Sequence, residues 1–248
     1  MRRYWREILL ILIILGSFLG MVFVHPIAQS PEYHNFADRR VFWGIPNFFD
    51  VTTNIPFMAF GLMGLIFCLN NRQKVAPWSW RILFLGVTLV CLGSAYYHWS
   101  PNNRTLVWDR LPMTIGFMGL FVGLMSEHSS NKLERIFLVP AILLGLLSVI
   151  YWHYCDDLRF YIWVQFIPLI CIPVVLALFK GEYNHRSYLI VALALYGLAK
   201  VAEIYDKEFF SFTQQQFSGH SLKHLLAALG PFSLYLMLKH RRQRETSG

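Results

Sequence analysis

Long apolar stretches constrain the fold of this chain more than any other feature of its sequence. Eight of them recur between short polar connections, at about residues 8–24, 51–69, 82–98, 106–125, 136–152, 160–179, 187–205 and 221–238. Each approaches the roughly 20 apolar residues that a helix needs to cross a bilayer. Backbone polar groups in lipid must be hydrogen-bonded within their own segment, so the stretches are predicted to be helices. The expected fold class is an all-α integral membrane protein.

Composition and the placement of basic residues agree with this class. Charged residues make up 15% of the chain, against about 25% in an ordinary soluble domain. The net charge of +8 would favour nucleic acid as a partner of a soluble protein, but basic residues set orientation in a membrane protein. Most of those in the connections fall on one predicted side: Arg2, Arg3, Arg6, Arg72, Lys74, Arg81, Lys132, Arg135, Lys180, Arg186, Lys239, Arg241, Arg242 and Arg244. We therefore expect both termini in the cytoplasm, a topological role for the basic tail and no nucleic-acid partner.

The first apolar stretch follows the basic segment MRRYWRE and has two interpretations. A secretory signal peptide has such a start, but this apolar run is long and no clear A-x-A cleavage site follows it. An uncleaved anchor is favoured, and cleavage stays open. The predicted domains are an N-terminal basic segment with its helix (1–27), a seven-helix membrane domain (28–238) and a basic cytoplasmic tail (239–248).

Ionisable side chains at membrane depth are costly and mark function, and this chain gathers them near one predicted membrane face. His98 ends the third stretch, Asp109 begins the fourth after a short connection, and the eighth starts from the same face with His220 and His224. Ser94 lies one helical turn before His98, so the two share a helix face. Each residue alone has a structural explanation, such as helix packing for Ser94. Their common depth favours a shared site.

The histidines have the spacing of a metal site. His220 and His224 are one turn apart and can hold one ion, as the histidines of H-E-x-x-H zinc helices do. His98 from a neighbouring helix completes three ligands. Catalytic zinc sites commonly use three protein ligands and keep the fourth position for water. The pattern therefore predicts a zinc site of catalytic type.

Other charged residues lie near the same predicted interface. Lys200, Glu203 and Asp206 are spaced i,i+3 and predict a structural ion-pair ladder. Lys200 and Glu203 are also candidates for outer partners of the metal site. Lys223, one residue before His224, is expected to point away from the metal.

The combined pattern resembles the alkaline ceramidase family, part of a wider group of seven-span membrane hydrolases that includes the adiponectin and progestin receptors. That family shares S-x3-H near one helix end, an Asp early on the next helix and H-x3-H on the last helix. The matching residues are Ser94, His98, Asp109, His220 and His224. The segments IPNFFDVTTNIPF and WDRLPM also resemble the family, although Arg110 stands where the family has an acidic residue. The resemblance spans about residues 35–235, so it implies a seven-transmembrane-helix bundle preceded by one extra N-terminal apolar helix.

The resemblance implies a mechanism for the matched residues. The implied zinc ligands are His98, His220 and His224. Asp109 would hold the attacking water as a general base and pass its proton to the leaving amine. Ser94 would donate a hydrogen bond to the developing oxyanion.

The resemblance also implies a calcium site ahead of the first core helix. Here that region, YHNFADRRVFWGIPN, offers Asp38 and Asn47 with Asn35 nearby. Arg39 and Arg40 stand where carboxylates are expected, so the sequence supports calcium only weakly.

The function that the resemblance implies is zinc-dependent hydrolysis of a lipid amide, with ceramide cleaved to a sphingoid base and a fatty acid. The expected partners are the bilayer and its lipid substrate, with the site toward the non-cytoplasmic face. Three alternatives stay open: a receptor-like seven-span zinc protein without ceramidase activity, a hydrolase of another amide or ester lipid, and an ion-coupled transporter. The sequence does not indicate an oligomeric state.

Overall fold

The chain folds into helices. The computed structural model describes residues 4–71, 78–128, 132–179, 183–184 and 186–242. The long helices there are α1 (Trp5–Phe23), α3 (Ile55–Asn70), α4 (Trp78–Trp99), α5 (Asn103–His128), α6 (Lys132–Cys155), α7 (Arg159–Leu178), α8 (Ser187–Ile204) and α10 (Gly219–His240). Three short helices join them, η1 (Pro31–His34), α2 (Phe48–Thr52) and α9 (Asp206–Phe212). Every predicted apolar stretch lies within or overlaps a long helix.

Seven of the described helical segments are long and apolar enough to cross a membrane: α1, α2 with α3, α4, α6, α7, α8 and α10. α5 is longer than any of these, with 26 residues, but it is more polar because it carries Asp109 and Arg110. Its polar residues face other helices, since both side chains are buried. The predicted class, an all-α membrane protein with an apolar helix at its N-terminus, is confirmed.

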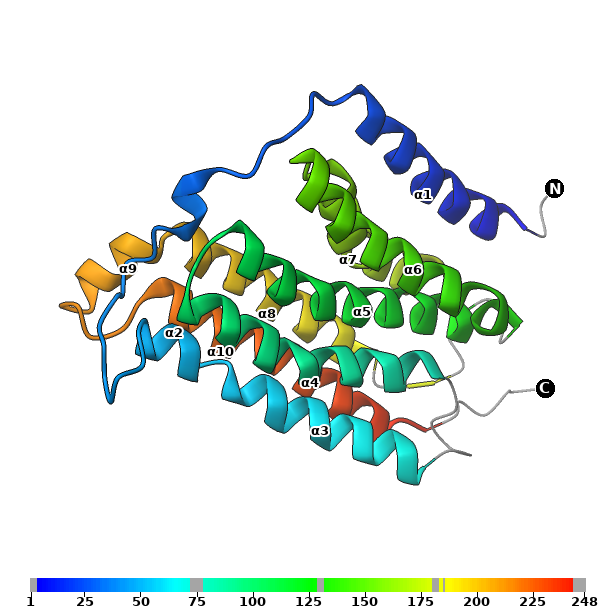
Figure 1. The fold of residues 1–248 in the computed structure, drawn as a ribbon. Coiled ribbons are helices and arrows are strands. Elements are labelled where there is room, and N and C mark those ends of the chain that lie inside the picture. The colour runs from blue at the N-terminus through cyan, green and yellow to red at the C-terminus, as the bar shows by residue number, and fades with distance from the viewer. Residues whose placement is uncertain (1–3, 72–77, 129–131, 180–182, 185, 243–248) are drawn as a thin grey trace.

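The helices form one bundle around a central cavity. α3, α4, α5, α7, α8 and α10 contribute residues to the cavity wall, and α6 packs outside against α5 and α7. α1 begins and α10 ends at one end of the bundle, whereas α2 and α9 lie at the other (Figure 1). Because α4 ends, and α5 and α10 begin, at the α2–α9 end, the polar residues predicted for the site are carried to one place.

Orientation in the membrane and the domain boundaries stay predictions. Some of the basic residues behind the orientation argument lie outside the described residues: Arg2, Arg3, Arg72, Lys74, Lys180 and Arg244. Others, such as Arg6, Arg135 and Lys239, lie on helix turns at the end where α1 begins. That placement is the one that the sequence argument requires.

α4 and α5 pack closely against each other along their length. The turn between them is capped by Asn102, whose Oδ1 accepts from the backbone N–H of Arg104 at 2.9 Å and of Thr105 at 3.1 Å. Gly93 faces the backbone carbonyl of Trp108 so closely that a Cβ on it would overlap that oxygen. Small residues allow such approaches between membrane helices. This contact fixes the end of α4, with Ser94 and His98, against the start of α5.

Substituting Gly93 with alanine is expected to destabilise the protein by about 1–3 kcal/mol, the usual cost of overpacking. The added methyl group would overlap the carbonyl oxygen of Trp108, which is part of the α5 backbone, so the two helices would have to move apart. Thermal unfolding of the detergent-solubilised protein measures the effect. Gly197→Ala is the matched control, since a Cβ there meets nothing within 4 Å. Equal melting temperatures for the two variants would contradict the proposed close contact.

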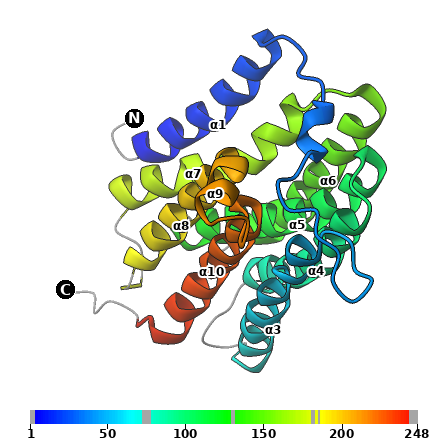
Figure 2. The ribbon, with the colours of Figure 1, turned by 90° about the vertical axis from the view of Figure 1, so that its left-hand side faces the viewer.

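α1 lies at the outside of the bundle along α7 (Figure 2). Trp163 Nε1 donates to Ser17 Oγ at 3.0 Å, and Arg159 donates to the carbonyl of Val24, just past the end of α1, at 2.5 Å. Arg159 also forms an ion pair with Asp157 at 2.7 Å. The hydrogen bonds that Arg159 donates to the Asp157 carboxyl group lower its pKa to about 2. The pair therefore stays ionised at neutral pH and ties the end of α1 to the α6–α7 connection. Whether α1 is an uncleaved anchor stays a prediction.

Candidate metal centre

Three histidines converge at the α2–α9 end of the bundle. His98 lies in the last turn of α4, and His220 and His224 lie in the first turns of α10. Their ring centroids form a nearly equilateral triangle with sides of 4.8, 4.9 and 4.8 Å. One nitrogen from each ring lies within 4.8 Å of the others. The exposed fractions are 1% for His98 and 3% for each of the other two, so the three rings are closed off from solvent.

Residues that flank α2 contact the ring of His224 and the backbone of His98. Thr53 Oγ1 lies 3.0 Å from His224 Nδ1, which leaves Nε2 of that ring to face the other two. Asn47 Nδ2 donates to the backbone carbonyl of His98 at 2.7 Å. A hydrogen bond to the second ring nitrogen, such as that of Thr53, sets the tautomer and direction of a metal-binding imidazole. The Asn47 contact instead fixes the backbone of the α4 turn that carries His98.

Phe36 covers the histidines from the connection that follows η1. Its ring centroid lies 4.4 Å from that of His220 and 4.8 Å from that of His98, and it is 6% exposed. In Figure 1 the chain runs from α1 to η1, and the connection after η1 passes the same end of the bundle. The segment therefore shields the histidines from water.

Two buried carboxylates hold the start of α10. Ser218 Oγ caps the helix by accepting from Ser221 N at 2.9 Å. Asp50 Oδ1 accepts from Ser221 Oγ at 2.7 Å, and Asp206 Oδ1 accepts from His220 N at 2.7 Å. Negative charge is favourable at a helix N-terminus, where unpaired N–H groups point outward. These contacts keep the turn that carries His220 in one position.

Asp50 and Thr53 belong to the surroundings of the histidines but were not predicted from the sequence. Both lie in the segment quoted for its family resemblance, where Asp50 is fully buried and Thr53 contacts His224. Asp50 could have been found from its place at the start of an apolar stretch, because a carboxylate at membrane depth marks a functional site. Thr53 offered no such signal, because its partner is 171 residues away.

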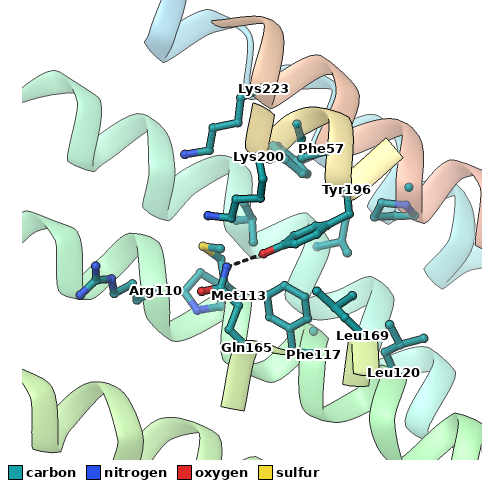
Figure 3. Close-up of a pocket in the computed structure, with 18 of the residues that line it drawn as sticks. Phe57, Arg110, Met113, Phe117, Leu120, Gln165, Leu169, Tyr196, Lys200 and Lys223 are labelled. Atoms are coloured by element: carbon teal, nitrogen blue, oxygen red, sulfur yellow. Dashed lines mark hydrogen bonds between the residues drawn. The ribbon is translucent and has the colours of Figure 1, made fainter. Parts of the chain in front are cut away.

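Ser94 and Asp109 lie together on the wall of the central cavity. The Ser94 side chain lies beside the Asp109 carboxyl group, and both residues are buried, at 3% and 8% exposure. His224 lines the same cavity, which has a volume of about 300 Å³. That is the lower end of the range for ligand pockets. The remaining wall is largely apolar, from side chains such as Phe117 and Leu120 (Figure 3).

Lys223 does not have the position expected from the sequence. Its ammonium lies 2.6 Å from Glu203 Oε1, and it lines the cavity with His224. Lys200 lies 2.6 Å from Glu203 Oε2, so this part of the predicted ladder is present, and Lys223 of α10 extends it. Asp206 does not join the ladder, because its carboxylate accepts from the backbone N–H groups of Ala37 and His220. Neighbouring side chains on a helix point about 100° apart. The cavity is nevertheless wide enough for both Lys223 and His224 to line it.

The region considered for calcium is occupied by an arginine. Arg40 donates to both oxygens of Asp38, at 2.9 Å from Nε and 2.6 Å from Nη2. The side-chain amide of Asn47 donates a hydrogen bond to the backbone carbonyl of His98. The three histidines are the group of metal-capable side chains found among the described residues. The expected weak calcium site at Asp38 and Asn47 gains no support from this arrangement.

The donor set fits zinc. Zinc takes imidazole nitrogens at about 2.0–2.1 Å in tetrahedral geometry, which separates two ligand nitrogens by about 3.3 Å. His98 Nε2 and His220 Nε2 are 3.3 Å apart. Three imidazoles without a fourth protein ligand match the open sites of zinc enzymes. The chain therefore provides a preformed cluster that can hold one metal ion.

Comparison with known proteins agrees with this geometry. No curated protein matches the sequence. The profile of the family described as Ceramidase matches residues 37–247, more than four fifths of the chain. The match covers all three histidines as well as Ser94 and Asp109, and it excludes α1. The chain belongs to the Ceramidase family.

Proposed function

We propose that this protein is a zinc-dependent hydrolase that cleaves the amide bond of ceramide, or of a closely related lipid, to give a sphingoid base and a fatty acid. The observation that carries the proposal is the apolar cavity that brings Ser94 and Asp109 together with His224, one of three clustered buried histidines. Membership of the Ceramidase family supports this substrate class.

The residues have separate tasks in this proposal. His98, His220 and His224 hold the metal, and zinc in a three-histidine site lowers the pKa of water from 15.7 to about 7, supplying a nucleophile at neutral pH. Asp109 accepts a proton from the attacking water and delivers it to the nitrogen of the leaving amine. Ser94 donates a hydrogen bond to the oxygen that becomes negatively charged.

The cavity positions the substrate for this chemistry. Apolar side chains of α5 and α7, among them Phe117, Leu120 and Leu169, provide a surface for an acyl chain (Figure 3). The polar residues lie where α4 ends and α5 begins, which is near the surface of the bilayer if these helices span it. With basic residues at the opposite end, the positive-inside rule directs the site toward the non-cytoplasmic face.

The full-length protein, purified in detergent, tests the proposal with a ceramide substrate. Mass spectrometry of the released sphingoid base measures turnover, and elemental analysis measures bound metal. We expect zinc to be present, turnover to stop after chelation and turnover to return when zinc is added. Zinc retained without turnover of any lipid amide or ester would instead favour the receptor-like alternative. A protein that binds no zinc would contradict the site.

Thr53→Val is expected to weaken zinc binding by about 10–100-fold, the usual effect of losing an outer partner of a ligand. The valine keeps the side-chain shape but cannot hydrogen-bond to His224. Competition with a fluorescent zinc chelator measures the affinity. Thr52→Val is the matched control, because the Thr52 hydroxyl donates to the carbonyl of Phe48 and contacts no histidine. Equal affinities of the two variants would show that Thr53 does not orient the ligand.

A further inference from the structure

One end of the cavity carries more positive than negative charge. Of the described residues that line it, Arg110, Lys200 and Lys223 are cations in their ordinary ionised states, and Asp109 and Glu203 are anions. The three cations therefore exceed the two anions by one. Figure 3 shows the three basic groups on one side of the cavity, with Phe117, Leu120 and Leu169 on the other.

Glu203 cannot neutralise both lysines. Its Oε2 accepts from Lys200 and its Oε1 from Lys223, each at 2.6 Å, and the hydroxyl of Tyr33 donates to Oε1 at 3.4 Å. Both carboxylate oxygens are thus already used. The lysine side chains keep exposed fractions of 33% and 18%, so part of each remains accessible.

Arg110 adds a cation that no described carboxylate pairs with. It is 4% exposed and lies over the rings of Trp152 and Tyr161, 4.0 and 4.6 Å from their centroids. Its Nη2 donates to Gln29 at 2.6 Å, but its buried Nη1 has no hydrogen-bond partner among the described residues. The ring of Tyr33, whose hydroxyl reaches Glu203, also lies 5.7 Å from the guanidinium. Arg110 and the lysine pair therefore border the same space.

A buried guanidinium N–H without an acceptor is costly unless a ligand completes it. Guanidinium and ammonium groups together are suited to carboxylate, phosphate or sulfonate oxygens. The apolar side of the cavity would take the hydrocarbon chain of the same ligand. We propose that Arg110, Lys200 and Lys223 bind an anionic headgroup, so that the protein prefers a negatively charged amide lipid to a neutral one. This inference rests on the proposed function, because it takes the cavity as the substrate site.

Binding to the metal-stripped, full-length protein in detergent tests the headgroup preference without requiring turnover. The probes are ceramide, ceramide 1-phosphate with the same acyl chain, and oleic acid. We expect the phosphorylated lipid to bind about tenfold or more tightly than ceramide, a free-energy difference of about 1.4 kcal/mol. Arg110→Gln and Lys223→Gln should each reduce that ratio. Lys200→Gln should also reduce that ratio. Lys200 is the most exposed of the three cations, so its substitution should disturb the fold least.

Arg104→Gln is the matched control, because Arg104 is an exposed cation on the same helix as Arg110 but outside the cavity. Equal affinities for the two ceramides, or a preference unchanged in all three cavity variants, would overturn the proposal. Tight oleate binding that depends on Arg110, with equal binding of both ceramides, would assign the cations to the released fatty acid and also overturn it. Selective binding without hydrolysis of either lipid would keep the anion site and contradict only the hydrolase function.

Discussion

Replacing His224 with alanine is expected to lower zinc affinity by more than about 100-fold, beyond the range for outer partners. His224 is one of the three buried histidines proposed to hold the metal, so its loss leaves two imidazoles in the cluster. Hydrolysis should fall to background, because the water nucleophile is no longer activated at neutral pH. Elemental analysis of the purified variant gives bound zinc, and release of sphingoid base gives activity.

His153→Ala is the matched control for this experiment. His153 is an exposed histidine of α6 and lies outside the cluster. It should leave both zinc and activity unchanged. If His224→Ala keeps a full complement of zinc while His153→Ala loses it, the metal centre has been placed at the wrong residues.

Asp109→Asn is expected to reduce turnover by about 10²–10⁴-fold, the usual contribution of a general acid–base residue. Asparagine fills the same space but cannot accept the proton of the attacking water. Zinc content should be unaffected, because Asp109 is not among the clustered ligands. The loss should appear in kcat more than in KM, since in the proposed complex the apolar wall, and not Asp109, holds the acyl chain. Steady-state kinetics with metal analysis separates these effects.

Glu208→Gln provides a carboxylate control on exposed α9. It should retain the activity of the unmodified protein. Wild-type turnover by a zinc-loaded Asp109→Asn variant would show that another group carries the proton. A variant that has lost its zinc would instead place Asp109 among the residues that hold the metal.

Local geometry made much of the histidine cluster predictable. His220 and His224 are one helical turn apart, so their common face can be inferred from spacing alone. His98 required one further step, because only the count of membrane crossings places it at the same face as the start of the last helix. The long helices were equally predictable, since lipid leaves few alternatives for an apolar segment.

The remaining contacts depend on how helices pack, which spacing does not describe. Asp50 and Ser221 are 171 residues apart, and nothing near either residue indicates the other. Lys223 was expected to point away from the metal because it is about 100° around the helix from His224. The sequence does not show how wide the cavity is, and the cavity is wide enough to be lined by both side chains. The short helix α9 was missed because its sequence, DKEFFSF, is brief and has no extended apolar pattern.

The tight α4–α5 contact has a consequence for the order in which the protein assembles during synthesis. These two helices are consecutive, so they can associate as soon as both have entered the bilayer, and domains generally form in the order they are made. Ser94, His98 and Asp109 would then be in place before α8 and α10 exist. The last helix brings two of the three histidines at once, so the ribosome must finish nearly the whole chain before a metal can be captured. A nascent chain that ends before α10 carries one of the three proposed ligands and the proposed general base, so we expect it to be inactive until the final helix is inserted.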